Sequence, residues 1–448
     1  MTIVGSRDRH EPQWHRSRAN AWLAVVRKLL VSPFRIVREL ASRRRLQRQM
    51  HAVRFAALTD GAISSGRTRP APIFPAVDSR LGPGLNIHGY LHGQFGLGES
   101  ARQYARALLQ AGYPASLADA GIAIPHACND QSLTPLMNAD MPHSVNLVFV
   151  NPDHFAEVQP RLPADGYTIG FWFWELDSIP SDWTKAIDAV DEVWVATEFV
   201  EQAFRRATTK PVIRIPHPIQ PVDGPALARS CFDLEEEAFV FLCSFDFNSS
   251  IHRKNPVAVI DAFILAFPDP TANVQLLIKT SNGHRHLRHL EQLCQHAAQD
   301  RRILVRDQVL SAGEVSALQH AANAYVSLHR AEGLGLGMAE SMAIGKPVIA
   351  TAWSGNLDFM DEQNSCLVPS RLIPVEDGQY PHTAGAQWAE ADVAAAAEWM
   401  VRLESSPALC REKGERARHA ITQLMSFDAA ATAMMARLRA LGLKQDSQ

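Results

Sequence analysis

Short apolar runs recur along the chain from Leu85 onward, and stretches with helical spacing separate them. In the first half, strands are predicted over residues 85–89, 145–150, 167–173, 193–196 and 211–215. The helices between these strands are predicted over residues 100–110, 183–190 and 198–206. Alternation of this kind is typical of a parallel sheet that helices cover on both faces.

The pattern then starts again behind a group of chain breakers, Pro216-His217-Pro218 and Pro221 to Gly224. Strands are predicted over residues 239–245, 274–279, 303–305, 324–329 and 347–351, and helices over 256–267, 286–298, 312–322 and 340–343. The Ala-rich segment from Gln387 to Leu441 is predicted to be helical. The expected fold class is α/β, with two doubly wound Rossmann-like domains facing each other across a cleft. Ligands of such sheets bind beyond the carboxyl ends of the strands, so candidate residues are sought there.

The composition is that of an ordinary globular protein. The chain has 448 residues, of which 46% are hydrophobic and 20% are charged, with 27 Pro and 25 Gly. These values exclude collagen-like, disordered and disulfide-scaffold classes. The length suggests two or three domains.

The net charge of -3 is divided unevenly along the chain. Residues 1–70 hold 15 Lys and Arg against 4 Asp and Glu, whereas the remainder carries a net charge of -14. We read residues 1–60 as a basic amphipathic extension around Trp22, divided by Pro33, and residues 61–83 as a linker. Three interpretations of the extension stay open: binding to an anionic membrane surface, packing on the body or a partner, and nucleic-acid binding. Without a recognisable reader motif, no nucleic-acid partner is expected.

The location expected for the protein is the cytoplasm. The six cysteines form no C-x-x-C pair, which is typical of a reduced compartment. No run approaches the 18 or so apolar residues that span a bilayer. Near the start, Arg27 and Lys28 interrupt the only apolar candidate for a secretory signal.

The strongest chemical signal is the segment from His329 to Glu340, which leaves a predicted strand, passes through alternating glycines and enters a helix. Glycines there let backbone N–H groups approach an anion, and the helix N-terminus adds partial positive charge. Glu332 and Glu340 bracket this turn on the cleft side, and carboxylates are acceptors suited to sugar hydroxyls. The alternative is a Gly-rich turn whose Glu residues cap the helix or lie in water.

A second signal follows the first strand of the second half, where Arg253 and Lys254 precede Asn255 and Pro256. Asn255 and Pro256 are read as the N-cap and first residue of the next helix. Adjacent cations at that place suit a diphosphate, which Arg binds as a fork and Lys as a point charge. A surface Arg-Lys pair is the alternative.

Two weaker signals lie in the first half. Gly96 and Gly98 belong to a Gly-rich loop that lacks the G-x-G-x-x-G pattern, so a dinucleotide fingerprint is not supported. Trp174 and Glu175 end an apolar strand at the expected cleft edge, where they could also be a buried aromatic cluster and a solvated carboxylate. The status of Asn151 and His154, just past an earlier strand, is similarly open.

These motifs resemble a known family. The spacing of Glu332 and Glu340 is similar to the E-x7-E motif of the retaining enzymes of glycosyltransferase family 4, which have the two-domain GT-B fold. The segments 341–351 and 354–356 resemble that family too, and the likeness extends over about residues 84–445. It implies an N-terminal acceptor-side domain over residues 84–222. It also implies a C-terminal nucleotide-sugar domain over residues 223–448, whose last helix crosses back to the N-terminal domain.

The resemblance also implies residue roles. In the family the first Glu contacts hydroxyls of the donor sugar and the second binds the nucleotide ribose, which assigns these roles to Glu332 and Glu340. Arg253 and Lys254 would neutralise the leaving diphosphate, although Cys243-Ser244 replaces the family's usual Gly before this loop. The remaining donor-binding candidates are Gly96, Gly98, Gly333, Leu334 and Gly335. Trp174 and Glu175 stand near the place of a His that touches the sugar in many members, and are candidate sugar or acceptor contacts.

We therefore expect a retaining glycosyltransferase that uses a nucleotide-diphosphate sugar, GDP-mannose-like or a UDP-sugar. No cofactor or metal is expected, since the chain contains no D-x-D. A glycan or lipid-linked acceptor at the inner face of the membrane, in bacterial surface polysaccharide synthesis, would fit the basic extension. The rivals are another GT-B enzyme, such as a phosphorylase or an epimerase, and a catalytically silent module that binds glycan or a partner.

Overall fold

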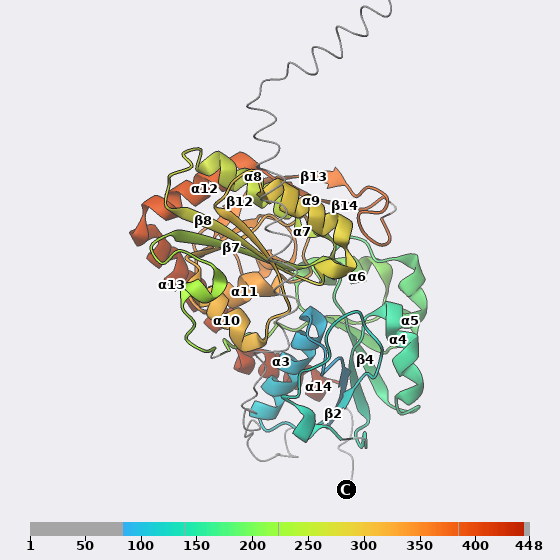
Figure 1. The fold of residues 1–448 in the computed structure, drawn as a ribbon. Coiled ribbons are helices and arrows are strands. Elements are labelled where there is room, and N and C mark those ends of the chain that lie inside the picture. Colours follow the sequence, from blue (N-terminus) through green and yellow to red (C-terminus); the bar gives the residue numbers. More distant parts are fainter. Residues whose placement is uncertain (1–83, 139, 223, 384, 443–448) are drawn as a thin grey trace, which may run out of the picture.

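The computed structural model describes residues 84–138, 140–222, 224–383 and 385–442. The predicted basic extension and linker, residues 1–83, therefore lie outside the described part of the chain. The described residues form two domains, each built on a six-stranded sheet (Figure 1).

The N-terminal domain has the strand order β2-β1-β3-β4-β5-β6, and every neighbouring pair is parallel. Its strands are β1 (Leu85–Gly89), β2 (Ala115–Asp119), β3 (Val145–Phe149), β4 (Tyr167–Phe171), β5 (Glu192–Val195) and β6 (Val212–Arg214). Its helices are α3 (Gly96–Gln110), α4 (Pro152–Val158), α5 (Thr184–Asp188) and α6 (Glu198–Ala207). Strand β2 and helix α4 were not among the predicted elements.

The C-terminal domain has the strand order β12-β11-β10-β7-β8-β9, again all parallel. Its strands are β7 (Phe239–Asp246), β8 (Val274–Ser281), β9 (Ile303–Asp307), β10 (Ala324–Ser327), β11 (Val348–Thr351) and β12 (Cys366–Val368). Its helices are α7 (Ile251–Lys254), α8 (Pro256–Ala266), α9 (Leu287–Ala297), α10 (Ala312–Ala321), α11 (Leu336–Ala343), α12 (Val393–Ser405), α13 (Pro407–Leu424) and α14 (Phe427–Ala440). The predicted fold class, two Rossmann-like domains in the GT-B arrangement, is confirmed.

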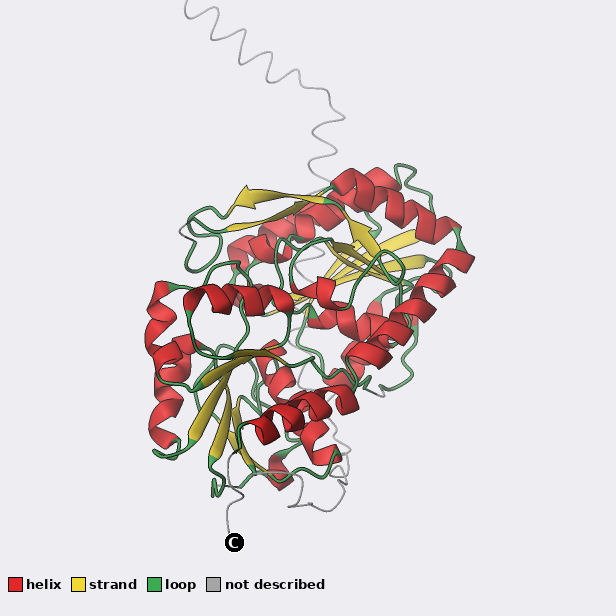
Figure 2. Ribbon diagram, turned by 180° about the vertical axis from the view of Figure 1, so that it is seen from behind, coloured by secondary structure: helices red, strands yellow, loops and turns green. Residues whose placement is uncertain are grey.

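The apolar runs form strands because helices cover both faces of each sheet (Figure 2). All five residues of β1 and all five of β3 are buried. Helix α3 is buried over most of its circumference, with every residue from Ser100 to Ala105 buried, as well as Ala107 and Leu108. These strands and this helix could be predicted because continuous apolar runs and helical spacing are visible in the sequence itself.

The last helix, α14, returns to the N-terminal domain and lies along α3 (Figure 1). Its Arg437 forms an ion pair with the fully buried carboxylate of Glu192 on β5. Glu192 also accepts hydrogen bonds from Trp194 Nε1, at 2.6 Å, and from Tyr167 Oη, at 3.3 Å. A buried carboxylate of one domain is thus neutralised by a cation that the C-terminal helix supplies.

The prediction of helix from Gln387 to Leu441 is wrong at its start. Residues Gln387–Ala391 form strand β14, which pairs antiparallel with β13 (Ser370–Pro374), and helix begins only at Val393. The reason is tertiary: Trp388 in β14 is fully buried in the hydrophobic cluster that also contains Trp172 and Trp183 of the N-terminal domain, and its ring centroid lies 6.4 Å from that of Tyr380. Burial of a large aromatic side chain outweighs the modest helix preference of Ala-rich sequence.

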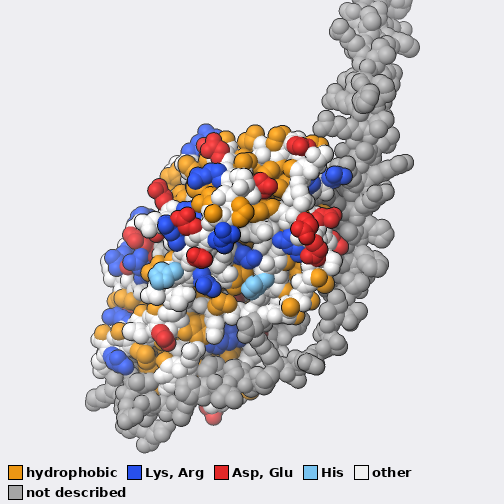
Figure 3. Space-filling view, turned by 90° about the vertical axis from the view of Figure 1, so that its left-hand side faces the viewer, with side chains coloured by type: hydrophobic (Ala, Val, Ile, Leu, Met, Phe, Trp, Pro, Cys, Tyr) orange, Lys and Arg blue, Asp and Glu red, His pale blue; other side chains and the backbone are white. Residues whose placement is uncertain are grey.

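The surface of the described domains mixes charges. Figure 3 shows Lys and Arg side chains interspersed with Asp and Glu on one face. Among the described helices, none combines the length and the apolar character that crossing a membrane would require.

We expect Arg437→Ala to lower the free energy of unfolding by about 3 kcal/mol, because it leaves the Glu192 carboxylate buried without its cation. Chemical denaturation followed by tryptophan fluorescence measures the loss. The control is the double variant Glu192→Gln/Arg437→Ala, which removes the buried charge and should recover part of the stability. An Arg437→Ala protein as stable as the wild type would contradict the prediction.

Candidate active site

A cavity of about 820 Å³ lies between the two domains, at the carboxyl ends of their strands. The predicted site residues that line it are Gly96, Trp174, Glu175, Arg253, Lys254, Glu332, Gly333, Leu334, Gly335 and Glu340. Strands β3, β4, β7 and β10 each lead into a loop that reaches this cavity. Candidates more than 200 residues apart in the sequence therefore meet in one place.

Glu332 is the centre of a cluster of charges. Its Oε1 accepts a short hydrogen bond from Lys254 Nζ, and its Oε2 lies 3.1 Å from Arg253 Nη1. Arg253 is held further by the backbone oxygens of Ser249, at 3.1 Å, and Ala331, at 2.9 Å. Because Arg253 is almost fully buried and tied to these groups, Lys254 is the cation more open to the cavity.

The charges of this cluster depend on one another. Burial alone would raise the pKa of Glu332, but the Lys254 ammonium and the Arg253 guanidinium lower it to about 2. Burial lowers the pKa of Lys254 despite the carboxylate beside it. Burial alone would also lower the pKa of Arg253, but the carboxylates of Glu332 and Glu175 outweigh this effect and raise it. The Glu332 carboxyl therefore stays ionised at neutral pH.

The loop that carries Glu332 rests on the segment 354–356. The Ser354 hydroxyl accepts a hydrogen bond from the backbone N–H of Glu332 at 2.8 Å, and Gly355 N–H donates to the Glu332 carbonyl at 2.9 Å. Buried His329 is close to Asn356 Oδ1, 3.2 Å from its Nε2. The Ser-Gly-Asn triplet thus holds the backbone of the Glu332 loop in place by hydrogen bonds.

Glycines let the Glu332 loop pass close to the N-terminal domain. A Cβ atom on Gly333 would come within 2.8 Å of the Trp174 carbonyl, and Gly335 has a φ of +95°. Helix α11 starts directly afterwards, and its first residues line the cavity. The N-terminus of α11, with its partial positive charge, therefore borders the same cavity as Lys254.

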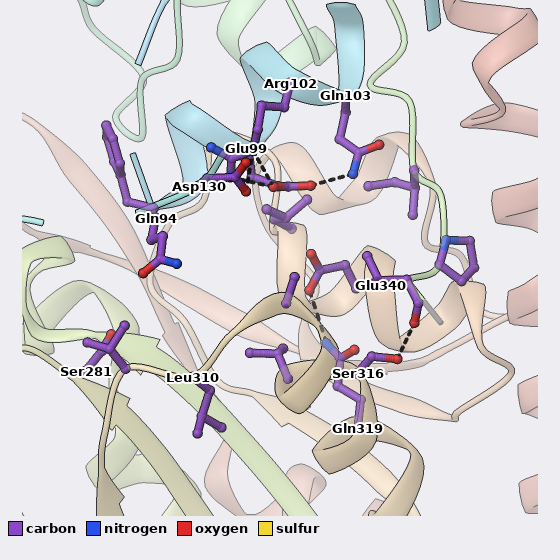
Figure 4. A pocket seen from close by; sticks show the side chains of 18 of the residues that line it. Gln94, Glu99, Arg102, Gln103, Asp130, Ser281, Leu310, Ser316, Gln319 and Glu340 are labelled. Atoms are coloured by element: carbon purple, nitrogen blue, oxygen red, sulfur yellow. Dashed lines mark hydrogen bonds and ion pairs between the residues drawn. The ribbon is translucent and has the colours of Figure 1, made fainter. Parts of the chain in front are cut away.

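Glu340, in α11, lies at the edge of a smaller cavity of about 220 Å³ that continues from the larger one (Figure 4). Its Oε2 accepts a hydrogen bond from Gln319 Nε2 of α10 at 3.1 Å. From the opposite domain, Glu99 of α3 points toward it, bound to Arg102 at 2.6 Å and to Gln103. Burial and the charge of Glu99 together raise the pKa of Glu340 to about 7.

The two glycines of the first loop differ in their surroundings. Gly96 lines the larger cavity, and a Cβ there would meet open space. Gly98 does not line either cavity, and a Cβ there would come within 2.4 Å of the Gly93 carbonyl. The structure therefore gives Gly98 a part in packing the start of α3 against the preceding turn.

Trp174 and Glu175 line the larger cavity from the N-terminal domain. The Trp174 ring is 4% exposed and packs against Trp183, with ring centroids 4.7 Å apart. Glu175 Oε1 lies 3.6 Å from Arg253 Nη2. The Asn151 side chain bonds the backbone of Phe173 through both its amide atoms, and Asn151 and His154 also line the larger cavity.

Several lining residues were missed by the sequence reasoning. They are Glu99, Lys279, Gln319, Tyr380 and His382. Glu99 directly follows the Gly-rich loop and could have been singled out there. Gln319 and Tyr380 belong to no local motif and reach the cavity only through the packing of their elements. Asn255 occupies the N-cap position before α8, as predicted. Its side chain, however, donates to the Leu328 carbonyl at 3.0 Å and makes no capping hydrogen bond to the helix.

In the part of the chain that the structure describes, no group of three or more His, Cys, Asp or Glu side chains is placed to hold a metal ion. The expectation of metal independence stays a prediction.

Two facing Rossmann-like domains with a carboxylate–cation cluster in the cleft are the arrangement of the GT-B fold. Residues 240–376, which include Arg253, Lys254, Glu332 and Glu340, match the family model described as "Glycosyl transferases group 1". This match confirms the predicted resemblance to group 1 glycosyl transferases and the predicted enzyme class over the residues that it covers. No curated protein is significantly similar to the chain in sequence.

Solved structures show the same fold. A sucrose-phosphate synthase from Thermosynechococcus elongatus has a TM-score of 0.59 at 19% identity, covering 80% of this chain and 99% of its own. A glycosyltransferase from Rickettsia africae has a TM-score of 0.58 at 12% identity, covering 81% of this chain and 100% of its own. HepE from Anabaena, solved with UDP and glucose, has a TM-score of 0.57 at 12% identity, covering 80% and 100%.

We expect nucleotide affinity to increase with pH through about 7, where the Glu340 carboxyl loses its proton. Because the charged form is the stronger acceptor for ribose hydroxyls, affinity should fall by up to about tenfold per pH unit below this pKa. Calorimetric titration with UDP, GDP and ADP at a series of pH values measures the effect. Glu340→Gln is the control, since it cannot titrate, and an equal pH slope in this variant would contradict the assignment.

Proposed function

We propose that the protein is a retaining, metal-independent glycosyltransferase that moves a hexose from a nucleotide-diphosphate sugar to a glycan or lipid-linked acceptor. The observation that carries this proposal is the charged cluster of Lys254, Arg253 and Glu332 at the N-terminus of α11, inside an interdomain cavity. A UDP-sugar or a GDP-mannose-like sugar fits the proposal.

Lys254 and the N-terminus of α11 would stabilise the negative charge that grows on the leaving diphosphate. Such electrostatic stabilisation by groups already in place contributes much of the rate of many enzymes. Arg253 would act mainly by holding Glu332, since its guanidinium already contacts this carboxylate and two backbone carbonyls. Cations in these positions would do the work that a divalent metal does elsewhere.

Glu332 would accept hydrogen bonds from hydroxyls of the donor sugar and favour its oxocarbenium-like transition state. Retention follows if the acceptor hydroxyl attacks from the face that the diphosphate leaves. The bond from the anomeric carbon to the phosphate oxygen then breaks as the bond to the acceptor oxygen forms. The acceptor proton passes to the leaving phosphate. Glu340 would hold the nucleotide ribose in the smaller cavity.

We expect Lys254→Ala and Glu332→Gln each to lower kcat by about 100-fold or more while nucleotide binding persists. Transfer from radiolabelled nucleotide sugars, assayed in EDTA, measures this effect. Lys185→Ala, which removes an exposed lysine of α5, is the matched control and should keep full activity. Loss of all transfer in EDTA, restored by Mg²⁺, would contradict metal independence.

The catalytically silent module is tested by the same titrations. Binding of one of UDP, GDP and ADP in EDTA, weakened by Glu340→Ala, would support a working donor site and identify the base. Failure of all three nucleotides to bind would favour the silent module. Net phosphorolysis with free phosphate would favour a phosphorylase instead.

The acceptor would be a growing surface polysaccharide at the cytoplasmic face of the membrane. The basic segment 1–60 would bind the membrane surface there.

We expect replacement of Arg43, Arg44 and Arg45 by Gln to weaken binding to phosphatidylglycerol vesicles by about 100-fold, at about 1 kcal/mol per cation. Vesicle sedimentation measures the change. Replacing the exposed residues Arg411, Arg416 and Arg418 of α13 by Gln is the matched control. Full binding by the first variant would exclude this role.

A further inference from the structure

The β13–β14 hairpin belongs to neither six-stranded sheet. It follows β12 in the C-terminal domain, and the described residues between its strands, 375–383 and 385–386, bend toward the N-terminal domain (Figures 1 and 2). Val375 and Ala386 at the base of this loop are buried in the same cluster as Trp174 and Trp183. The loop is therefore anchored to the other domain by apolar packing.

The tip of the hairpin is also fixed by hydrogen bonds on both sides of the cleft. Tyr380 Oη donates to Glu175 Oε2 of the N-terminal domain at 2.7 Å. On the other side, Ser250 Oγ donates to the Gln379 carbonyl at 2.7 Å. The Tyr380 ring lies 5.7 Å from the Arg253 guanidinium carbon and 5.8 Å from the Trp174 ring centroid. These contacts place the ring beside the charged cluster.

Tyr380, Pro381 and His382 line the larger cavity together with Asp153, and none of the four lines the smaller cavity at Glu340. His382 Nε2 is 3.8 Å from Asp153 Oδ1, and its Nδ1 is 3.9 Å from the carboxylate of Asp182. This end of the cavity thus combines an aromatic ring with carboxylates and an imidazole. Its chemistry differs from that of the end that holds Glu340.

We propose that the hairpin tip forms a binding subsite for an uncharged sugar ring of the acceptor, an inference that rests on the proposed transferase function. The apolar face of a sugar ring packs on an aromatic side chain, while carboxylates and imidazole accept and donate hydrogen bonds to its hydroxyls. The carboxylates of Asp153 and Glu175, which line this end of the cavity, would disfavour a phosphate group there. The subsite therefore selects a neutral glycan end over a sugar phosphate.

The hairpin also links this subsite to the donor side. Glu175, which accepts the Tyr380 hydroxyl, lies 3.6 Å from Arg253, and Arg253 in turn lies 3.1 Å from Glu332. The acceptor end and the donor carboxylate thus share one chain of contacts. Tyr380→Phe keeps the ring and loses the hydroxyl, whereas Tyr380→Ala loses both, so the two variants separate ring packing from positioning.

Saturation-transfer NMR on the full chain, saturated with the nucleotide that binds in calorimetry, tests the subsite. The probes are the methyl glycosides of glucose, galactose, mannose and N-acetylglucosamine, beside glucose 6-phosphate. We expect at least one neutral glycoside to bind and glucose 6-phosphate to bind more weakly. Tyr380→Ala and His382→Ala should each weaken the neutral glycoside by about tenfold, with nucleotide affinity changed by less than about twofold. Tyr380→Phe should keep most of the affinity.

Leu372→Ala, an exposed position on β13, is the control and should bind both ligands as the wild type does. Preserved nucleotide affinity shows that each variant is folded. Stronger binding of glucose 6-phosphate, no binding of any neutral glycoside, or unchanged glycoside affinity in both Tyr380→Ala and His382→Ala would each overturn the subsite. Failure of the wild type to bind any nucleotide is a separate result, which overturns the proposed function itself.

Discussion

The buried carboxylate of Glu332 is the group on which the arrangement of the cleft depends. A charge that is 7% exposed is costly unless cations and hydrogen bonds compensate it. Lys254 and Arg253 provide the cations from helix α7, which follows β7, and the segment 354–356 holds the backbone of Glu332. Three segments that follow three strand ends must therefore converge at one point. The pKa of about 2 follows from this convergence.

The two ends of the cleft are chemically different because different elements line them. At one end, α3 places Glu99 opposite Glu340 in the smaller cavity. At the other end, the β13–β14 hairpin carries Tyr380 to Glu175. Ligand groups of different charge and polarity would therefore bind on either side of the central cluster. Helix α14 also joins the domains by packing on α3, and none of its residues lines either cavity.

Candidate residues that follow a strand end in the sequence are the ones that the structure brings together in the cavity. Glu332, Glu340 and Lys254 stand in loops directly after apolar strands or in the helix behind such a loop, and parallel strands carry these loops to one edge. Gly98 shows the limit of this reasoning, because a glycine needed for packing looks the same in sequence as one that faces a ligand. Tyr380 and Gln319 could not be found, since neither stands in a local pattern.

The sequence by itself determined the two parallel sheets and the strand-end residues of the site, because period and local motif are properties of neighbouring positions. Only the tertiary structure decided that Gln387–Ala391 is a strand, that Tyr380 reaches Glu175, and that Glu99 faces Glu340. Each of these outcomes depends on contacts between residues far apart in the chain. The energy of burying Trp388 or of bringing two carboxylates together appears only when both partners are in place.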